Sequence, residues 1–390
     1  MRVGFFIALY HPASGGAEVQ AALQAKKLSE RGISVEVVTS RLPGTRAHEN
    51  IDGIPVRRIS YFSEKPWVPA KRIIRFAEVL RNSWKDNRYD VIHVHGASDY
   101  FSVAALLAAR STGARSVLKI ACSGDWLDVA VLRRQFLLGR LLLRSARGAD
   151  RIIAINSDMT SLLLGYGFKR DSIVEIPNGV ELTHQQATSR NHELRNELKV
   201  SVDTPIVVYS GSLTPRKNVE ALVEAVSLMK DRGTACHLVL VGDGGSREDI
   251  ERRVYDTGLG KAVSFTGFVD DVRPYLRAAD VFALPSLAEG LSNSVLEAMS
   301  VGLPCVVTSV PGNTDLVDDG RTGYLVPPGD QKSLANVLER LLADPASARS
   351  SGARARDMVE RRFSIDSTVD RLLETYESLL GRTPVVDRAP

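Results

Sequence analysis

Residues 280–299, Asp-Val-Phe-Ala-Leu-Pro-Ser-Leu-Ala-Glu-Gly-Leu-Ser-Asn-Ser-Val-Leu-Glu-Ala-Met, contain a strand, a polar turn and the beginning of a helix. The apolar run at 280–284 predicts a buried strand, and helical spacing begins near Asn293. In parallel sheets, ligands bind beyond the carboxyl ends of the strands. The turn between this strand and this helix is therefore predicted to carry function.

The same alternation of short apolar strands and longer helical segments extends along the whole chain. Strands without a polar face indicate parallel sheets that are covered by helices on both sides. A polar break divides the alternation into two series, which predicts an α/β protein of two Rossmann-like domains facing each other across a cleft. The predicted strands are 3–9, 34–39, 90–95, 115–121, 151–155, 173–176, 205–210, 236–241, 262–265, 280–284 and 304–308, and the predicted helices are 17–31, 99–111, 217–230, 246–257 and 293–301.

The domain boundaries follow from this pattern. We expect an N-terminal Rossmann-like domain at 1–180, a linker region at 181–203 and a C-terminal Rossmann-like domain at 204–364. The chain is then helical over 365–380, and 381–390 is expected to be a frayed tail.

The composition is that of a globular protein of two domains, with 390 residues, 44% hydrophobic and 25% charged. Cys122, Cys236 and Cys305 lie far apart, so we expect a reducing compartment and neither a disulfide framework nor a zinc site. Arginines interrupt the longest apolar stretches, and no cleavage site follows the apolar N-terminus. We therefore expect a cytoplasmic protein, free or resting on the inner face of the cell membrane.

Charge is divided unevenly between the two halves. Residues 1–180 carry 26 Lys and Arg against 16 Asp and Glu, whereas residues 181–390 carry 24 against 30. This split predicts that the first half faces an anionic partner, although charge scatter between two domains explains it equally simply. The basic segments 65–88 and 130–147 are candidates for contact with an anionic membrane, or else are amphipathic helices packed on a sheet. The sequence contains no known motif for nucleic-acid recognition, so we expect no nucleic-acid partner.

Glycine pairs follow two of the predicted strands. Ser14-Gly15-Gly16 precedes a helix, and Gly242-Asp243-Gly244-Gly245 follows the strand at 236–241. Such turns let backbone N–H groups approach a phosphate closely. Neither the three-glycine dinucleotide fingerprint nor the Gly-Lys-Ser/Thr phosphate loop is present, which disfavours a dehydrogenase or a nucleotide hydrolase.

Charged side chains follow two further strands. Arg216 and Lys217 come after the strand at 205–210, where adjacent cations suit a departing diphosphate. Glu289 precedes the helix at 293–301 and Glu297 lies in its early turns, so both carboxylates are expected to face the same point. Carboxylates there suit sugar and ribose hydroxyls, while the free N–H groups of the helix suit phosphate. The alternative is that both glutamates are structural: Glu289 is then a surface residue, and Glu297 stabilises the helix dipole.

Together these motifs resemble the donor site of family 4 glycosyltransferases, which have the GT-B fold. The resemblance continues through Ile176-Pro-Asn-Gly-Val180, Phe265-Thr-Gly-Phe-Val269 and the run from Asn313 to Val326, and so covers nearly the whole chain. It implies that the N-terminal domain binds the acceptor, that the C-terminal domain binds the nucleotide-sugar donor, and that a C-terminal helix crosses back to the N-terminal domain. It also implies a retaining glycosyltransferase with a nucleotide-sugar donor, uridine being the commonest carrier. The acceptor would be a saccharide or lipid-linked saccharide in cell-surface polysaccharide or glycoconjugate biosynthesis.

The resemblance also implies roles for individual residues. Carried over by motif position, Glu289 would contact sugar hydroxyls and Glu297 the ribose. Lys217 would neutralise the leaving phosphate with help from Arg216, and Val269 would lie near the base. The remaining predicted donor-binding residues are Gly15, Gly16, Gly242, Gly290, Leu291, Ser292 and Asn293.

Two positions depart from the family pattern. Ser212 stands where members place an arginine, and we expect Arg216 to compensate. The N-domain strand that usually supplies a histidine has Ala121 or Cys122 instead. We expect Lys119 or Asp125 to take over part of that role, and His95 is a third candidate on the acceptor side.

We expect His93 and His95 to point to opposite faces of their strand and therefore not to share a metal, with His93 as a packing residue. No Asp-x-Asp follows a strand, and Asp270-Asp271 and Asp318-Asp319 are predicted to be turn and cap residues. Arginine and lysine already supply positive charge, so we expect neither a metal nor another cofactor.

Two other functions on the same fold stay open. One is a non-catalytic nucleotide-sugar binding protein, which Ser212 favours, and the other is a nucleotide-sugar epimerase. The presence of Glu289, Glu297 and Lys217 argues against a chain that has lost its chemistry.

Overall fold

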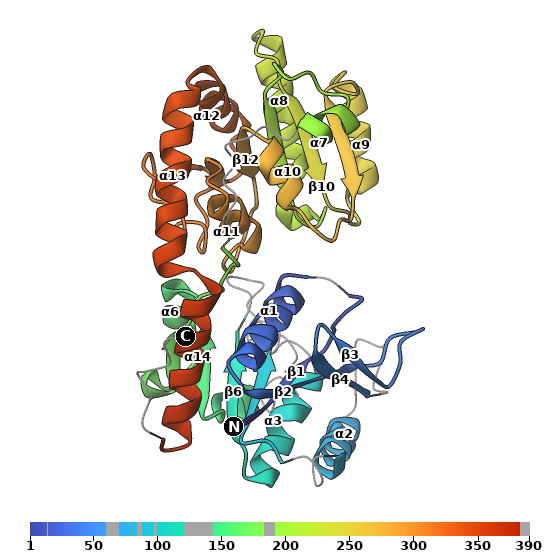
Figure 1. The fold of residues 1–390 in the computed structure, drawn as a ribbon, viewed down its shortest axis with the longest axis vertical. Helices are drawn as coiled ribbons and strands as arrows, with labels where there is room; N and C mark the ends of the chain where they lie inside the picture. Colours follow the sequence, from blue (N-terminus) through green and yellow to red (C-terminus); the bar gives the residue numbers. More distant parts are fainter. Residues whose placement is uncertain are drawn as a thin grey trace. The chain divides into compact units, whose positions relative to one another are not determined.

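The computed structural model describes residues 1–13, 15–59, 70–83, 88–96, 100–120, 143–182 and 192–382. The chain forms two compact units. The first unit comprises residues 1–178 together with 365–390, and the second comprises residues 179–364. Each unit is a mostly or wholly parallel sheet with helices packed on it, as Figure 1 shows. The expected α/β class with two Rossmann-like domains is confirmed.

The first unit contains an eight-stranded sheet in the order β3-β4-β2-β1-β5-β6-β7-β8. All neighbouring strands are parallel except β3 and β4, which are antiparallel. The strands are β1 (Arg2–Ile7), β2 (Ser34–Ser40), β3 (His48–Ile51), β4 (Ile54–Ile59), β5 (Val91–His95), β6 (Arg115–Lys119), β7 (Arg151–Ala154) and β8 (Ile173–Glu175).

Sequence analysis did not predict β3 and β4. Neither is an apolar run, because β4 contains Pro55, Arg57 and Arg58. Both arginines are nevertheless buried, since each is paired with a carboxylate: Arg57 with Glu36, and Arg58 with Glu49. Ion pairing thus stabilises an edge of the sheet that hydrophobic patterning does not mark.

The described helices of the first unit include α1 (Gly16–Glu30), α2 (Ala70–Ser83), α3 (Tyr100–Thr112), α6 (Ser157–Gly165), a single turn η2 (Arg170–Ser172) and α14 (Ile365–Leu379). Asn156 caps α6 by accepting a hydrogen bond from the N–H of Met159 at 2.7 Å. α2 packs on α3, where the rings of Phe76 and Phe101 lie 5.5 Å apart.

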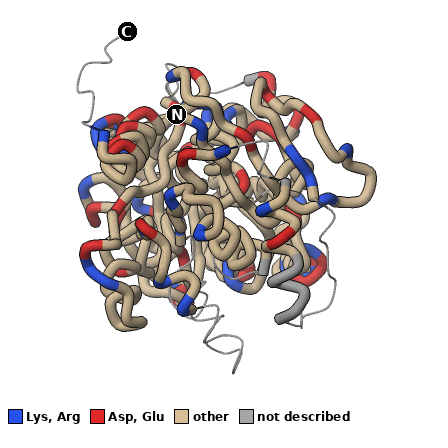
Figure 2. The backbone as a smooth tube through the Cα atoms, turned by 90° about the horizontal axis from the view of Figure 1, so that it is seen from below, with Lys and Arg blue, Asp and Glu red and all other residues tan. Residues whose placement is uncertain are grey.

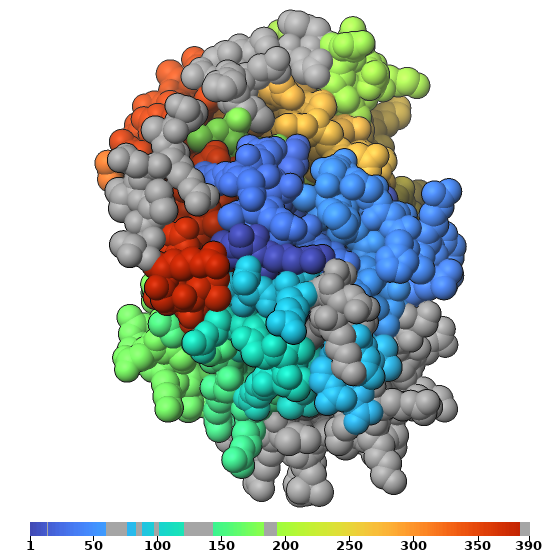
Figure 3. Space-filling view, turned by 60° about the horizontal axis from the view of Figure 1, so that its bottom comes forward, coloured from blue at the N-terminus to red at the C-terminus, as the bar shows by residue number. Residues whose placement is uncertain are grey.

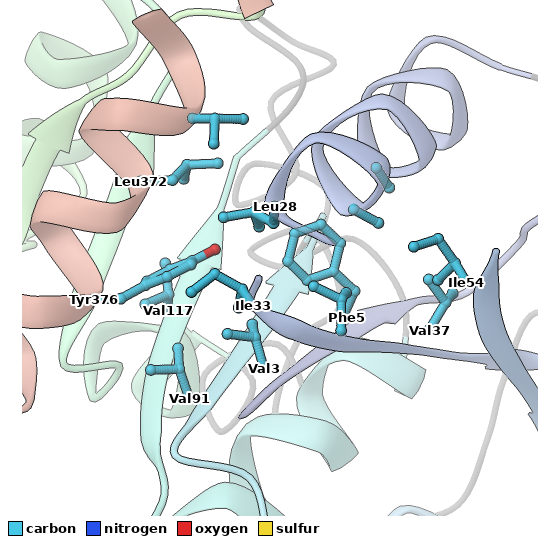
Figure 4. Packing of buried hydrophobic residues seen from close by; sticks show 14 of the residues in the cluster. Val3, Phe5, Leu28, Ile33, Val37, Ile54, Val91, Val117, Leu372 and Tyr376 are labelled. Atoms are coloured by element: carbon cyan, nitrogen blue, oxygen red, sulfur yellow. The ribbon is translucent and has the colours of Figure 1, made fainter. Parts of the chain in front are cut away.

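α14 belongs to the first unit although it is the last helix of the chain. Its buried residues Leu372 and Tyr376 join Phe5 of β1 and Leu28 of α1 in one apolar cluster, shown in Figure 4. Arg31, at the end of α1, forms ion pairs with Asp366 and Asp370 of α14. In the space-filling view of Figure 3, α14 (red) lies beside the first residues of the chain (dark blue).

The second unit contains a six-stranded parallel sheet in the order β11-β10-β9-β12-β13-β14. Its strands are β9 (Ile206–Ser210), β10 (His237–Val241), β11 (Val263–Gly267), β12 (Val281–Leu284), β13 (Cys305–Thr308) and β14 (Tyr324–Val326). Its helices are α7 (His192–Glu197), the single turn η3 (Pro215–Lys217), α8 (Val219–Asp231), α9 (Arg247–Asp256), α10 (Arg273–Ala278), α11 (Asn293–Ser300), α12 (Gln331–Ala343) and α13 (Pro345–Arg362). The strand order reverses between β9 and β12, and ligands bind at such a switch point in open parallel sheets.

Part of the expected linker at 181–203 is an ordered element of the second unit, since it contains the helix α7. Within it, α7 carries Arg195, whose side chain is fully buried. The Arg195 guanidinium donates to the carbonyls of Ser201, Thr204 and Ala278 and to the carboxylate of Asp280, at 2.8–3.2 Å. Residues 192–204 are therefore fixed to the strand that ends at the predicted site.

Figure 2 shows Lys and Arg interspersed with Asp and Glu along the described backbone. None of the helices in the described ranges is both long enough and apolar enough to span a bilayer. Most of the basic segment 130–147, and the ends of the segment 65–88, lie outside the described residues.

Candidate active site

The loops that follow β9 and β12 meet at the switch point of the second unit. Arg216, in η3 after β9, accepts a hydrogen bond from the N–H of Leu287 through its carbonyl at 2.8 Å. Its guanidinium donates to the carbonyl of Ala288, also at 2.8 Å. These bonds hold the predicted cations against the predicted glutamate.

Lys217 and Glu289 form a buried ion pair at this point. Lys217 Nζ lies 2.6 Å from Glu289 Oε1, and the two residues are only 8% and 6% exposed. The partly exposed guanidinium of Arg216 lies 3.5 Å from the other oxygen, Glu289 Oε2. One carboxylate thus meets two cations, which leaves a net positive charge beyond the ends of β9 and β12.

Tyr209 completes the floor of this cluster. It is fully buried in β9, and its hydroxyl donates to the carbonyl of Ser212 at 2.9 Å. Burial, with the nearby negative charge of Glu289, raises the pKa of Tyr209 well above its ordinary value. The phenol is therefore a fixed neutral donor that shapes the turn containing Ser212. Sequence analysis missed this role, because the hydroxyl acts inside an apolar strand.

Glycine residues leave the backbone without side chains in the loops at the ends of β9, β10 and β11, next to this cluster. A methyl group on Gly242, whose φ is +130°, would lie 2.0 Å from the carbonyl oxygen of Gly211. Gly211 N–H donates to the Val241 carbonyl at 3.0 Å, and Gly242 N–H donates to the Gly267 carbonyl at 2.9 Å. The loops after three adjacent strands are thus packed backbone against backbone, which a side chain at Gly242 would prevent.

The turn before α11 is equally tight. Leu291 and Ser292 are buried, and Asn293 is the first residue of α11. A methyl group on Gly312, whose φ is +86°, would lie 2.1 Å from the carbonyl oxygen of Gly290. α11 begins only a few residues after the buried Glu289. The positive end of the helix dipole is the end of α11 that follows this carboxylate in the chain.

Glu297 lies one to two turns into α11 and is partly buried. Burial raises the pKa of Glu297 to about 7; the negative charge of Asp271 adds to this shift, and Arg273 opposes it. Arg273 Nε in turn donates to Asp271 Oδ1 at 2.7 Å. Glu297 therefore changes its charge near neutral pH, which sequence reasoning did not anticipate.

Val269 follows β11 and is partly exposed, beside Phe268, which is 63% exposed. Of the aspartates predicted to be turn and cap residues, Asp271 accepts from the Arg273 N–H at 3.0 Å and Asp319 from the Leu325 N–H at 2.8 Å, so both fasten turns and neither is the N-cap of a helix. Within the described ranges, no three His, Cys, Asp or Glu side chains are grouped as metal ligands would be.

Gly15 and Gly16 belong to the first unit, at the beginning of α1. Gly15 is the N-cap, and a methyl group on it would lie 2.4 Å from Glu18 Oε2. Burial raises the pKa of Glu18. Ser14, Cys122 and Asp125 lie outside the described residues.

The acceptor-side candidates His95 and Lys119 are neighbours, and our expectation for the two histidines was wrong. The rings of His93 and His95 are stacked with centroids 4.3 Å apart, because residues two apart on a strand share one face. Lys119 pairs with His95 in the register of β5 and β6, and all three side chains are buried. The first unit therefore has its own cluster of predicted site residues, as the second unit has around Glu289.

The chain is similar to known proteins over most of its length. A family model described as "Glycosyl transferase 4-like domain" matches residues 15–179, and one described as "Glycosyl transferases group 1" matches residues 204–344. N-acetyl-alpha-D-glucosaminyl L-malate synthase of Bacillus anthracis is 27% identical over 380 residues, covering 95% of this chain and 96% of that protein. The 2-deoxystreptamine N-acetyl-D-glucosaminyltransferase of Streptomyces fradiae is 29% identical over 400 residues, covering 95% and 92%.

Solved structures share the fold. The crystal structure of Anabaena HepE in complex with UDP and glucose superposes with a TM-score of 0.79 at 21% sequence identity. The match covers 96% of this chain and 99% of HepE. The two-unit fold is therefore the GT-B architecture of glycosyltransferases.

Proposed function

The chain belongs to the group 1 glycosyl transferases with a 4-like N-terminal domain, and from this premise we propose its reaction. It transfers a sugar from a nucleotide-diphosphate sugar, with UDP as the carrier, to a saccharide or lipid-linked acceptor. The transfer retains the anomeric configuration and requires no metal. The product belongs to cell-surface polysaccharide or glycoconjugate biosynthesis.

One observation supports this proposal above the others: the Lys217–Glu289 pair, with Arg216 beside it, at the switch point of the second unit. In the proposed complex, Lys217 and Arg216 face the donor diphosphate, and N–H groups of residues 290–293 bind its oxygens. Glu289 then accepts hydrogen bonds from sugar hydroxyls, and Glu297 from the ribose. The backbone at Gly242 and the side chain of Val269 border the nucleoside.

The chemical step we propose is a same-face displacement. The bond between the anomeric carbon and the diphosphate oxygen breaks, and its electron pair leaves with the phosphate. The acceptor hydroxyl oxygen forms the new bond to that carbon, and its proton passes to the departing phosphate oxygen. Lys217 and Arg216 stabilise the negative charge that grows on the diphosphate, which is a preorganised electrostatic contribution.

The donor carrier and the acceptor rest on unequal support. UDP as carrier is supported by HepE, which was crystallised with UDP and glucose. The relatives give no single acceptor, because L-malate is a dicarboxylate and 2-deoxystreptamine is an amine. Similarity alone therefore leaves the charge of the acceptor open.

A thermal-shift panel of UDP, GDP, ADP and their sugar conjugates tests the donor half of the proposal. A ligand at a hundredfold its dissociation constant adds about 2.7 kcal/mol to the free energy of unfolding, which is easily measured. We expect UDP and a UDP-sugar to raise the melting temperature, and Glu297→Ala to weaken that shift. Glu374→Ala, on the exposed side of α14, is the matched control and should keep the full shift.

The same panel separates the alternatives. No shift with any nucleotide would contradict the donor site. A UDP-sugar that binds but releases no UDP with any acceptor would favour the non-catalytic binding protein. Interconversion of the UDP-sugar without an acceptor would favour the epimerase.

A further inference from the structure

Three basic side chains are gathered at the carboxyl edge of the first unit's sheet. His93 and His95 lie on β5, and Lys119 is the last residue of β6. His95 and Lys119 are register partners, so they lie side by side at the ends of adjacent strands. Each of the three residues is no more than 4% exposed. We call these three residues the basic cluster.

The partners of the basic cluster are neutral. His93 Nδ1 lies 2.6 Å from the hydroxyl of Tyr376, and Lys119 Nζ donates to Asn178 Oδ1 at 2.8 Å. The Nε2 atoms of His93 and His95 are buried without a hydrogen-bond partner. In the part of the chain that the structure describes, no carboxylate pairs with any of the three.

Burying such a group without an anion weakens the fold. Burial lowers the pKa of Lys119 to about 7, and burial together with Lys119 lowers the pKa values of both histidines. The same face of the sheet is otherwise apolar, with Phe5, Ile7 and Val117 in its core. An apolar residue at position 119 would match this surrounding better. Costly, perturbed groups at the ligand-binding edge of a parallel sheet are a mark of a functional site.

We propose that His95 and Lys119 bind an anionic group, a carboxylate or a phosphate, on the sugar acceptor. Lys119 exchanges its neutral partner Asn178 for the anion, and His95 Nε2 supplies the second donor. His93, held by Tyr376, fixes the ring of His95 by stacking on it. This inference rests on the proposed function and narrows it: an acidic acceptor resembling malate in charge fits, whereas an amine would add a further cation.

The anion is assigned to the acceptor because the side chains proposed to neutralise the donor diphosphate lie in the other unit. Lys217, Arg216 and α11 all belong to the second unit. If the basic cluster served the donor diphosphate instead, UDP and a small anion would compete. If it serves the acceptor, their effects on stability are independent.

Thermal shift with inorganic phosphate and with malonate tests the inference, against NaCl at equal ionic strength. Phosphate stabilises many proteins without binding a site, so the readout is the difference between variants. We expect a saturable shift in the wild type and a midpoint concentration at least about tenfold higher in Lys119→Met, as loss of a hydrogen bond to a charged group implies. Lys169→Met, at an exposed lysine of the same unit, should respond as the wild type does.

Asn178→Asp provides a second, isosteric variant. It places a carboxylate at the position that accepts from Lys119 at 2.8 Å, so the chain supplies its own anion. We expect this variant to melt higher than the wild type and to lose its saturable response to phosphate and malonate. Equal responses in the wild type, Lys119→Met and Asn178→Asp would overturn the proposal.

Saturating UDP distinguishes the two possible sources of the anion. Additive shifts from UDP and malonate support an acceptor subsite, and loss of the malonate response in the presence of UDP overturns it. Absence of any UDP shift would instead count against the proposed donor chemistry. The UDP shift therefore tests the donor proposal, and the malonate shift tests the anion subsite, so the failure of one can be told from the failure of the other.

Discussion

Glu297 illustrates how one partly buried carboxyl group links stability to pH. Its pKa is about 7 in the native chain, against an ordinary value of 4.5. Between these pH values the native state binds more protons than the unfolded state, so the free energy of unfolding falls as pH rises. We expect the decrease due to this group to be up to about 3 kcal/mol between pH 4.5 and 7.

Urea unfolding of the wild type and Glu297→Gln at pH 5 and pH 8 measures this contribution. The glutamine variant should lose less stability than the wild type between the two pH values, because its side chain does not ionise. Equal losses in the two proteins would show that Glu297 titrates normally.

The Lys217–Glu289 pair predicts a strong coupling between two single substitutions. Lys217→Met removes the shorter of the two ion pairs from a buried carboxylate and leaves the longer one to Arg216, which should cost about 3 kcal/mol of stability. Glu289→Gln in the same chain removes the stranded charge, so the double variant should be more stable than Lys217→Met alone. Urea unfolding of the four proteins in a double-mutant cycle gives the coupling, and strictly additive losses would contradict it.

At the residue scale, sequence patterning identified residues but not their partners. Arg216, Lys217 and Glu289 were each predicted from the end of a strand, and the structure brings them together. The burial of Arg195 was not foreseen, because it depends on distant acceptors such as the carbonyl of Ala278, which lies 83 residues away in the chain. The prediction for the two histidines was wrong for a simpler reason: residues two apart on a strand point to the same face, and His93 and His95 were assigned to opposite faces.

At the scale of elements, the glycine loops make a testable claim about backbone contact. Gly242→Ala should destabilise the second unit and abolish the UDP shift, since its methyl group meets a carbonyl oxygen at 2.0 Å and φ is +130°. Gly245→Ala is the control, because nothing lies within 4 Å of the added methyl group. Melting temperatures with and without UDP measure both effects, and a Gly242→Ala protein indistinguishable from Gly245→Ala would refute the argument.

Elements with apolar strands were predictable, and those stabilised by other means were not. Each predicted strand overlaps an observed one, because period and burial agree there. β3, β4 and β14 were missed, since β4 is buried through paired arginines and β14 has only three residues. Hydrophobic patterning detects burial by apolar contact and does not detect burial by ion pairing.

At the scale of the whole molecule, α14 makes the first unit discontinuous in sequence. A fragment of residues 1–178 lacks α14 and would expose the cluster that contains Phe5 and Leu28. We expect this fragment to aggregate or to unfold without cooperativity. Met1 and Leu380 pack against the same cluster. A second fragment, in which residues 365–382 are joined through a short Gly-Ser linker to residue 1 of the 1–178 fragment, should therefore unfold in a cooperative transition. Circular dichroism melts of both fragments check this, and a cooperative melt of 1–178 alone would contradict it.

The fold class was predictable at this scale because alternation of strands and helices extends along the entire chain. The membership of α14 in the first unit depends on particular contacts, such as Arg31 with Asp366, that join residues over 300 positions apart. No periodicity in the sequence encodes such a pairing. Resemblance to a family supplied that expectation instead.

The late position of α14 also sets an order of events during synthesis. Residues 1–178 leave the ribosome first, yet the helix that covers their apolar face follows only after residues 179–364 have been made. At 5–20 residues per second this takes roughly 10 to 40 s. The second unit is contiguous and can complete its fold within that interval, so the half translated second matures first. The nascent first half meanwhile presents Phe5 and Leu28 to the cytosol, where a chaperone that shields apolar surface would find its binding site.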